Sequence, residues 1–247
     1  MLSADGRTLL VDSMIKAVIF DFGQTLVDSA EAFRAAEKQA EKRIFDSLAL
    51  TSWRDFLENY RRIRKQFHEK SNFSRKALWQ EVYRHYRRQC NEELLENWEH
   101  EYWEKVKAGT TPFPETEQVL KILASKYQLA VITNTQGQEN SDKHRIAQLS
   151  QLEGFFDTII IAGESGIPAK PDPAPFLLCL KRLGVSSDEA VYVGDDWYID
   201  ICGAMNASIQ PVWLKHHSVR RNQPVVETLV PIISSLDRLL DLDSIFV

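Results

Sequence analysis

The sequence predicts an α/β protein: a Rossmann-like parallel sheet with helices on both faces, together with a small α-helical cap domain. Two observations lead to this prediction. Short apolar runs rich in valine and isoleucine recur along the chain, and helical patterns separate them. One long stretch, residues 29–108, contains several helical patterns and no apolar run of this kind.

The predicted strands lack polar alternation, which is typical of parallel strands that are buried on both faces. They cover residues 17–21, 129–134, 158–163, 190–196 and 211–214, with 231–236 as a candidate sixth strand. The predicted helices between them cover residues 116–127, 141–152, 172–184 and 200–208. In such sheets, ligands bind at the carboxyl ends of the strands.

The helical insertion divides the chain into two predicted domains. Residues 1–28 and 109–247 form the α/β core, and residues 29–108 form the cap. Amphipathic helices are expected in the cap at residues 30–49, 53–70, 75–90 and 92–109. The cap carries 17 Lys and Arg residues against 14 Asp and Glu, whereas the whole chain has a net charge of −5. A basic cap could attract an anion into the cleft below it, although solvation of helix faces explains these charges more simply.

The N-terminal residues precede the predicted sheet. Residues 1–13 lack the basic and apolar regions of a signal peptide, and we expect them to form a tail. An edge strand at "TLLV" is the alternative. Met14 comes directly before the first predicted strand, so it is an alternative start of translation.

Composition argues against several classes of protein. The chain is 44% hydrophobic and 26% charged, which is ordinary for a soluble globular protein. Its pI of about 5.7 is unlike that of a nucleic-acid-binding protein. No apolar run approaches the roughly 20 residues of a membrane helix, so we expect no membrane partner. The three cysteines form no metal-binding pattern, which indicates free thiols and a cytoplasmic location. The oligomeric state cannot be predicted.

Polar residues follow the apolar runs where ligands are expected to bind. These residues are Asp21, Thr133 and Asn134, Asp195 and Asp196, with Asp200 one turn later. Adjacent carboxylates repel one another unless a cation neutralises them, and oxygen ligands suit magnesium. Lys170 lies in "GIPAKPDPAPF", where the neighbouring prolines stiffen the loop and fix the direction of the ammonium group.

Four motifs in one order carry a resemblance to a known family. They are "DFGQT", "VITN", "AKPDPAPF" and "GDDWYID", with the helical insertion directly after the first. In this arrangement the sequence resembles the haloacid dehalogenase-like hydrolase superfamily over residues 14–245. The resemblance implies a magnesium-dependent phosphoric monoester hydrolase that acts on a small phosphorylated metabolite through an aspartyl-phosphate intermediate.

The resemblance also implies a role for each motif residue. The catalytic residues would be Asp21 as nucleophile, Thr133, Lys170 and Asp200. The phosphoryl group would be bound by Thr133, Asn134 and Lys170. Mg²⁺ would be held by Asp21, the backbone carbonyl of Gly23 and Asp195, with Asp196 as a further candidate ligand. Asp200, or Asp196, would orient Lys170.

Gly23 departs from the family pattern, because phosphatases of the superfamily usually carry a second aspartate at this position. That aspartate acts as general acid and base, which is worth roughly 10²–10⁴-fold in rate. Gln24 and His68 are candidates to replace it. Three alternatives therefore stay open: a 2-haloacid dehalogenase, a phosphonatase-like hydrolase with a reactive cap lysine, and a non-catalytic phospho-ligand-binding or regulatory protein.

Overall fold

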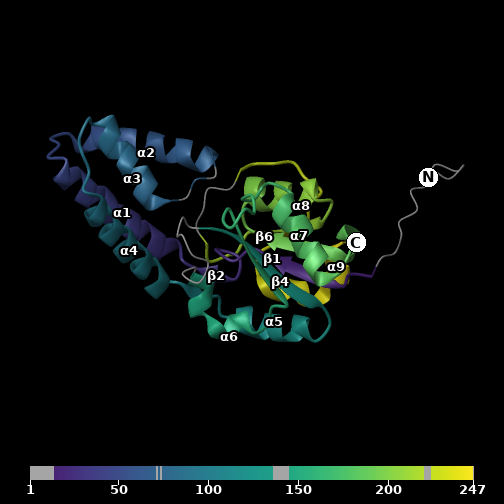
Figure 1. Ribbon diagram of the computed structural model, residues 1–247. Helices are drawn as coiled ribbons and strands as arrows, with labels where there is room; N and C mark the ends of the chain where they lie inside the picture. The colour runs from purple at the N-terminus through teal and green to yellow at the C-terminus, as the bar shows by residue number, and fades with distance from the viewer. Residues whose placement is uncertain (1–13, 71, 73, 136–144, 220–223, 247) are drawn as a thin grey trace, which may run out of the picture.

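A computed structural model describes residues 14–70, 72, 74–135, 145–219 and 224–246. In these ranges an α/β core and a helical bundle lie side by side (Figure 1). The predicted tail at residues 1–13 and the alternative strand "TLLV" lie outside the described residues.

The core contains one parallel sheet of six strands, as the sequence predicts. The strands are β1 (Ala17–Phe20), β4 (Gln128–Asn134), β5 (Thr158–Ala162), β6 (Ala190–Gly194), β7 (Gln210–Leu214) and β8 (Ile232–Ile233). Their spatial order is β5-β4-β1-β6-β7-β8, and each neighbouring pair is parallel. The candidate strand at 231–236 is therefore present, although it is reduced to two residues.

β1 lies at the centre of the sheet. Ala17 pairs with Gln128 on β4 and with Ala190 on β6. All four β1 side chains are fully buried. Alternate β1 side chains enter two separate apolar clusters, one on each face of the sheet. A continuous apolar run is the sequence that such a two-sided position requires.

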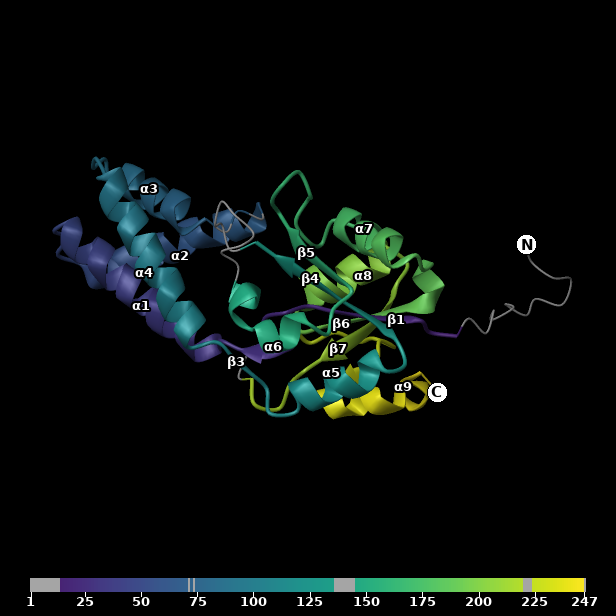
Figure 2. The same ribbon diagram turned by 60° about the horizontal axis from the view of Figure 1, so that its bottom comes forward.

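Helices cover both faces of this sheet, which gives the core three layers (Figure 2). One face carries α5 (Thr116–Ala124), the 3-10 helix Leu236–Asp241 and α9 (Leu242–Ile245). The other carries α7 (Ala174–Leu183) and α8 (Cys202–Asn206). A short 3-10 helix, Ser187–Glu189, leads into β6.

Residues 141–144 of the helix expected at 141–152 lie outside the described residues, and the rest of that range does not form one α-helix. A 3-10 helix, Arg145–Gln148, and a short helix, α6 (Ser150–Glu153), occupy its second half. Ile146, Leu149 and Leu152 contact the sheet at a spacing of three residues. Leu149, between the two short helices, has φ −110° and ψ 56°, which is outside the α-helical region, so the chain does not form one continuous helix here.

The bundle consists of four helices: α1 (Ala30–Ser47), α2 (Trp53–Glu69), α3 (Arg75–His85) and α4 (Glu92–Ala108). Three of them begin where the sequence offers a capping side chain. Ser52, Ser74 and Asn91 accept hydrogen bonds from backbone N–H groups in the first turns of α2, α3 and α4. The bundle encloses an apolar cluster of its own, separate from the two clusters of the core. We call this bundle the cap.

Two segments of the chain connect the cap to the core. They pair as a short antiparallel ribbon, β2 (Val27–Asp28) with β3 (Thr111–Pro112). Both views show the strands of the core running toward the cap, so their carboxyl ends face it (Figures 1 and 2). Within the described ranges, no helix combines the length and the apolar character that crossing a bilayer requires.

Candidate active site

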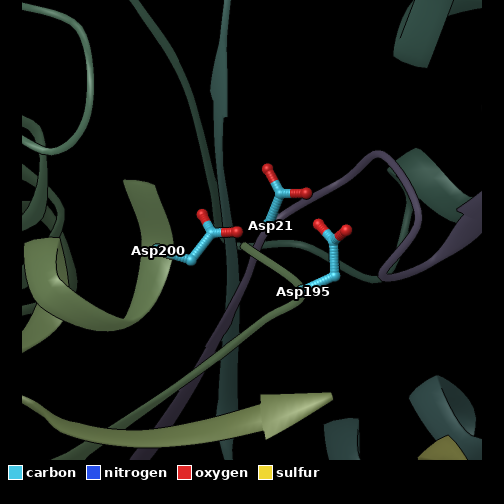
Figure 3. A group of neighbouring side chains, drawn as sticks. All are labelled: Asp21, Asp195 and Asp200. Atoms are coloured by element: carbon cyan, nitrogen blue, oxygen red, sulfur yellow. The ribbon is translucent and has the colours of Figure 1, made fainter. Parts of the chain in front are cut away.

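Three buried carboxylates meet at the carboxyl ends of the central strands. Asp21 follows β1, Asp195 follows β6, and Asp200 lies one turn further on (Figure 3). One oxygen from each lies within 4.8 Å of the others. The three residues are only 8%, 5% and 2% exposed, so water screens their mutual repulsion poorly.

Lys170 places its ammonium group among these carboxylates. Its Nζ donates hydrogen bonds to Asp21 Oδ1 (2.8 Å), Asp200 Oδ1 (2.6 Å) and the hydroxyl of Tyr192 (2.8 Å). These three acceptors satisfy all three N–H groups of a lysine that is 1% exposed. Burial alone would lower the pKa of Lys170, but Asp200 and Asp21 hold it above its ordinary value.

Tyr192 belongs to this network, and the sequence analysis did not identify it. It lies in β6, in a stretch that we interpreted as core, and its ring is fully buried. Its hydroxyl accepts from Lys170 and lies 3.1 Å from Asp200 Oδ1. A tyrosine inside an otherwise aliphatic strand was the available signal, because a buried hydroxyl requires a polar partner.

Asp200 sits in a π-helix, Trp197–Ile201, which α8 then continues. The predicted helix at 200–208 therefore starts earlier and with a wider turn. Gly194 makes room for this turn, since a Cβ there would lie 2.4 Å from the Cβ of Asp200. Burial raises the pKa of Asp200 to about 6, against the opposing charge of Lys170. A bound divalent cation would favour the ionised form.

Thr133 and Asn134 end β4 at the same edge of the sheet. Thr133 is 3% exposed. The side chain of Asn134 makes two hydrogen bonds to the backbone of Lys170. Its Nδ2 donates to Lys170 O (3.1 Å), and its Oδ1 accepts from Lys170 N (2.8 Å). Asn134 thus positions the lysine that was expected to share phosphate binding with it.

Asp196 lies beside the three carboxylates and caps the π-helix. Its Oδ1 accepts from the N–H groups of Tyr198 and Ile199, while its own N–H donates to Asp200 Oδ2. The group of three therefore comprises Asp21, Asp195 and Asp200, and Asp196 contributes through the backbone.

The two candidates for a replacement proton donor lie in different places. Gln24 follows Gly23 directly, and its Nε2 donates to Ser29 Oγ (2.9 Å). His68 lies on α2 of the cap. Partial desolvation, together with the charges of Arg75 and Arg64, lowers the pKa of His68 to about 4. His68 is therefore unprotonated near pH 7 and is a poor proton donor there.

The donor set fits a hard divalent cation. Three carboxylates around one lysine leave an excess of negative charge in a buried position, which a cation would compensate. Carboxylate oxygens are also the ligands that magnesium prefers. The backbone of Asp195 is fixed by a hydrogen bond, since Trp213 Nε1 donates to Asp195 O (3.0 Å).

Comparisons with known proteins show which family the chain belongs to. The sequence profile of a hydrolase family, described as haloacid dehalogenase-like hydrolase, matches residues 15–207. A glyceraldehyde 3-phosphate phosphatase from Methanothermobacter thermautotrophicus is 30% identical over 92% of this chain and 100% of its own length. The human N-acylneuraminate-9-phosphatase is 24% identical over 92% and 94% of the two chains.

Solved structures show the same fold. A 2-haloacid dehalogenase from Pseudomonas syringae is 28% identical, with a TM-score of 0.65 over 94% of this chain and 99% of its own. The HAD-hydrolase YfnB from Bacillus subtilis is 20% identical, with a TM-score of 0.63 over 93% and 98%. The YfnB structure is described as bound to magnesium and as revealing interdomain movement.

The fold and the strand-end cluster define a Rossmann-like α/β core with an inserted helical cap. The chain belongs to the haloacid dehalogenase-like hydrolase family, since the profile covers most of its length. The predicted family, fold and enzyme class are thereby confirmed.

Proposed function

We propose that the protein is a magnesium-dependent phosphatase that hydrolyses a small phosphorylated metabolite. The observation that carries this proposal is the buried group of Asp21, Asp195 and Asp200 around Lys170. The phosphatase names of the curated relatives support it, and they suggest phosphorylated sugars and sugar acids as the first substrates to assay.

In this mechanism Asp21 is the nucleophile. A carboxylate oxygen of Asp21 attacks phosphorus, the ester P–O bond breaks, and the alcohol leaves with a proton taken up from its surroundings. Water then attacks the phosphorus of the aspartyl-phosphate, which releases inorganic phosphate and regenerates Asp21. The hydroxyl of Thr133 would donate a hydrogen bond to an oxygen of the transferring phosphoryl group.

Lys170 would change partners during the reaction. Its three N–H groups are occupied by Asp21, Asp200 and Tyr192 before substrate binds. Phosphorylation removes the charge of the Asp21 carboxylate, which weakens one of these bonds. The N–H group so released can then bind the phosphoryl oxygens, while Asp200 and Tyr192 keep the ammonium group in place.

Magnesium would be held by Asp21, Asp195 and the backbone carbonyl of Gly23. When bound, it supplies charge neutralisation for the phosphoryl group and for the carboxylates around it. We also propose that the cap moves on the β2–β3 ribbon, because a site at strand ends needs a cover to exclude water. The free thiols Cys90, Cys179 and Cys202 support a cytoplasmic location.

The decisive experiment is turnover of p-nitrophenyl phosphate with magnesium, with and without EDTA. We expect activity that EDTA abolishes and that Asp21→Asn lowers by more than about 10³-fold, because the nucleophile is lost. Asp46→Asn is the matched control, since Asp46 is an exposed α1 residue paired with Lys42. Full activity in EDTA, or in Asp21→Asn, would exclude this mechanism.

A 2-haloacid dehalogenase remains the second candidate, because a structure of that name is 28% identical. In that reaction the same aspartate attacks carbon and displaces a halide. Chloride release from 2-chloropropionate, in the same preparation, separates the two functions. The paired acids of "GDDWYID" favour the phosphatase, because the dehalogenase branch does not usually keep them.

A further inference from the structure

A cavity of about 570 Å³, open to the surface, lies in the cap between α1 and α2. The described residues that line it all come from the four cap helices, so it is distinct from the strand-end cluster. Five of its lining side chains are cationic: Arg34, Lys38, Arg61, Arg64 and Arg75. Two are acidic, and the cavity therefore carries three more positive than negative formal charges.

Glu37, the first of the two acidic side chains, already has four polar partners within the cap. It pairs with Arg64 (3.1 Å) and Arg75 (3.6 Å) and accepts from the hydroxyls of Tyr60 (2.9 Å) and Tyr102 (3.0 Å). Burial would raise its pKa, but Arg75 and Arg64 hold the pKa of Glu37 below its ordinary value. One carboxylate thus serves two guanidinium groups.

Arg75 is the more unusual of these two arginines because it is buried. It is 8% exposed, and its guanidinium stacks over the ring of Tyr102 at 5.1 Å. Its Nε faces Glu37 Oε2 at 3.6 Å, which is an ion pair but too long for a hydrogen bond. A buried guanidinium group that shares one distant counter-ion with a second arginine is an environment in which an anionic ligand would be favourable.

The second acidic side chain, Glu41, interacts with Arg64 and Arg61. Burial and the charge of Glu37 nevertheless raise the pKa of Glu41 above its ordinary value. One further carboxylate therefore faces the remaining cations of the cavity. Arg34 pairs with Glu31 outside the cavity. For Lys38 and Arg61, no ion pair is found within the described ranges.

The position of the cavity suits a ligand that also reaches the core. α1 begins at the β2–β3 ribbon, and the C-terminal end of α2 is its end nearest the core in both views (Figures 1 and 2). Arg61 and Arg64 lie in this half of α2. The strands of the core run toward the same side of the molecule.

We propose that this cavity binds a second anionic group of the substrate. The substrates would then be phosphomonoesters that also carry a carboxylate or a second phosphate. The guanidinium groups of Arg61, Arg64 and Arg75 offer paired N–H donors for either anion. The aromatic side chains of Phe33, Trp53 and Tyr102 supply an apolar wall for the carbon chain, and the volume suits a sugar acid. This inference rests on the proposed phosphatase function.

The test compares esters that differ only in the second anion. 6-Phosphogluconate and glucitol 6-phosphate differ in a carboxylate, and fructose 1,6-bisphosphate and fructose 6-phosphate differ in a phosphate. We expect a higher kcat/KM for the anionic member of at least one pair. Which pair responds identifies the anion.

Arg61→Met should reduce that preference by about tenfold to a hundredfold, mainly through KM, because a charge-assisted hydrogen bond is lost. Arg62→Met is the matched control, because Arg62 is an equally exposed neighbour that does not line the cavity. It should leave the preference unchanged. Arg75→Met tests the buried guanidinium group and should also reduce the preference. Thermal unfolding of this variant shows whether the cap stays folded.

The outcomes separate this inference from the phosphatase proposal. p-Nitrophenyl phosphate carries no second anionic group, so its turnover tests the phosphatase proposal alone, and a wild-type enzyme without this activity would refute that proposal. An active enzyme that prefers neither anionic ester would overturn the cap inference alone. If no ester is hydrolysed, calorimetry with 6-phosphogluconate still decides: equal affinity in wild type and Arg61→Met overturns the inference, and weaker binding by Arg61→Met supports it.

Discussion

Gly23 removes one side chain from a site whose other groups are in place. Among the described residues, the glycines with positive φ are Gly163, Gly166 and Gly184, so the φ angle at Gly23 is one that an L-residue can adopt. We predict that Gly23→Asp speeds glycerol 3-phosphate hydrolysis more than p-nitrophenyl phosphate hydrolysis. An alkoxide needs a proton to leave, whereas a nitrophenolate does not.

The kcat/KM ratio of the aryl to the alkyl ester should fall by at least about tenfold. Gly23→Asn has nearly the same volume and cannot titrate, so it should leave the ratio unchanged. An unaltered ratio in a stably folded Gly23→Asp protein would mean that the proton comes from another group.

Much of the site was predictable at this scale, because strand-end aspartates are visible in the sequence. Asp21, Asp195, Asp200 and Lys170 are brought together as the motif order implies. The role of Asn134 was not predictable. Its amide can bind a phosphate or a backbone equally well, and only the path of the Lys170 loop decides between them.

Among the helices, α1 carries Glu37, a residue that contacts all three other helices of the cap. Glu37 connects α1 with Tyr60 and Arg64 on α2, with Arg75 on α3 and with Tyr102 on α4. We predict that Glu37→Gln destabilises the protein by about 3 kcal/mol, because it leaves the buried guanidinium group of Arg75 without its counter-ion. Urea unfolding followed by tryptophan fluorescence measures this, since Trp53, Trp79, Trp98 and Trp103 lie in the cap.

Glu41→Gln, one turn along α1, is the matched control and should be neutral or stabilising. The pKa of Glu41 is raised, so its charge is unfavourable in the folded state, whereas the pKa of Glu37 is lowered. The Glu37 contribution is therefore present above the unfolded-state pKa of about 4.3 and is lost as pH falls through the lower folded-state value. Equal effects of the two substitutions at pH 7 would contradict this account.

Helix positions were predictable where local signals agreed with packing. The cap helices start at Ser52, Ser74 and Asn91, which are capping residues in the sequence and in the structure. The helix expected at 141–152 is interrupted at Leu149, whose backbone is not helical. The apolar spacing of three residues does not reveal such a break, because it also suits one face of an α-helix.

For the molecule as a whole, the junction between cap and core is tightly packed at Gly109. A Cβ on Gly109 would lie 2.6 Å from the Cβ of Ala32, where α4 meets the start of α1. We predict that Gly109→Ala forces these helices apart, costs about 1–3 kcal/mol and lowers turnover of substrates that contact the cap. Thermal unfolding and kcat/KM measure both effects.

Ala32→Gly in the same chain removes the clashing methyl group and should restore much of the loss. A double variant as impaired as Gly109→Ala would show that the defect lies in backbone freedom and not in this contact. A full-rate Gly109→Ala enzyme would mean that the junction tolerates displacement.

The cap is inserted in the chain between β1 and β4, its neighbour in the sheet. This insertion also sets the order in which the chain can assemble as it leaves the ribosome. Ala17 of β1 pairs with Gln128 and Ala190, both of which are synthesised after the entire cap. The apolar cluster of the cap, by contrast, is complete in the chain before β4 has been made. The central strand, apolar on both sides, must therefore wait as an uncovered segment while its own insertion is translated. The nascent chain thus exposes this apolar strand early and can pair its two edges only after β4 and β6 have been made.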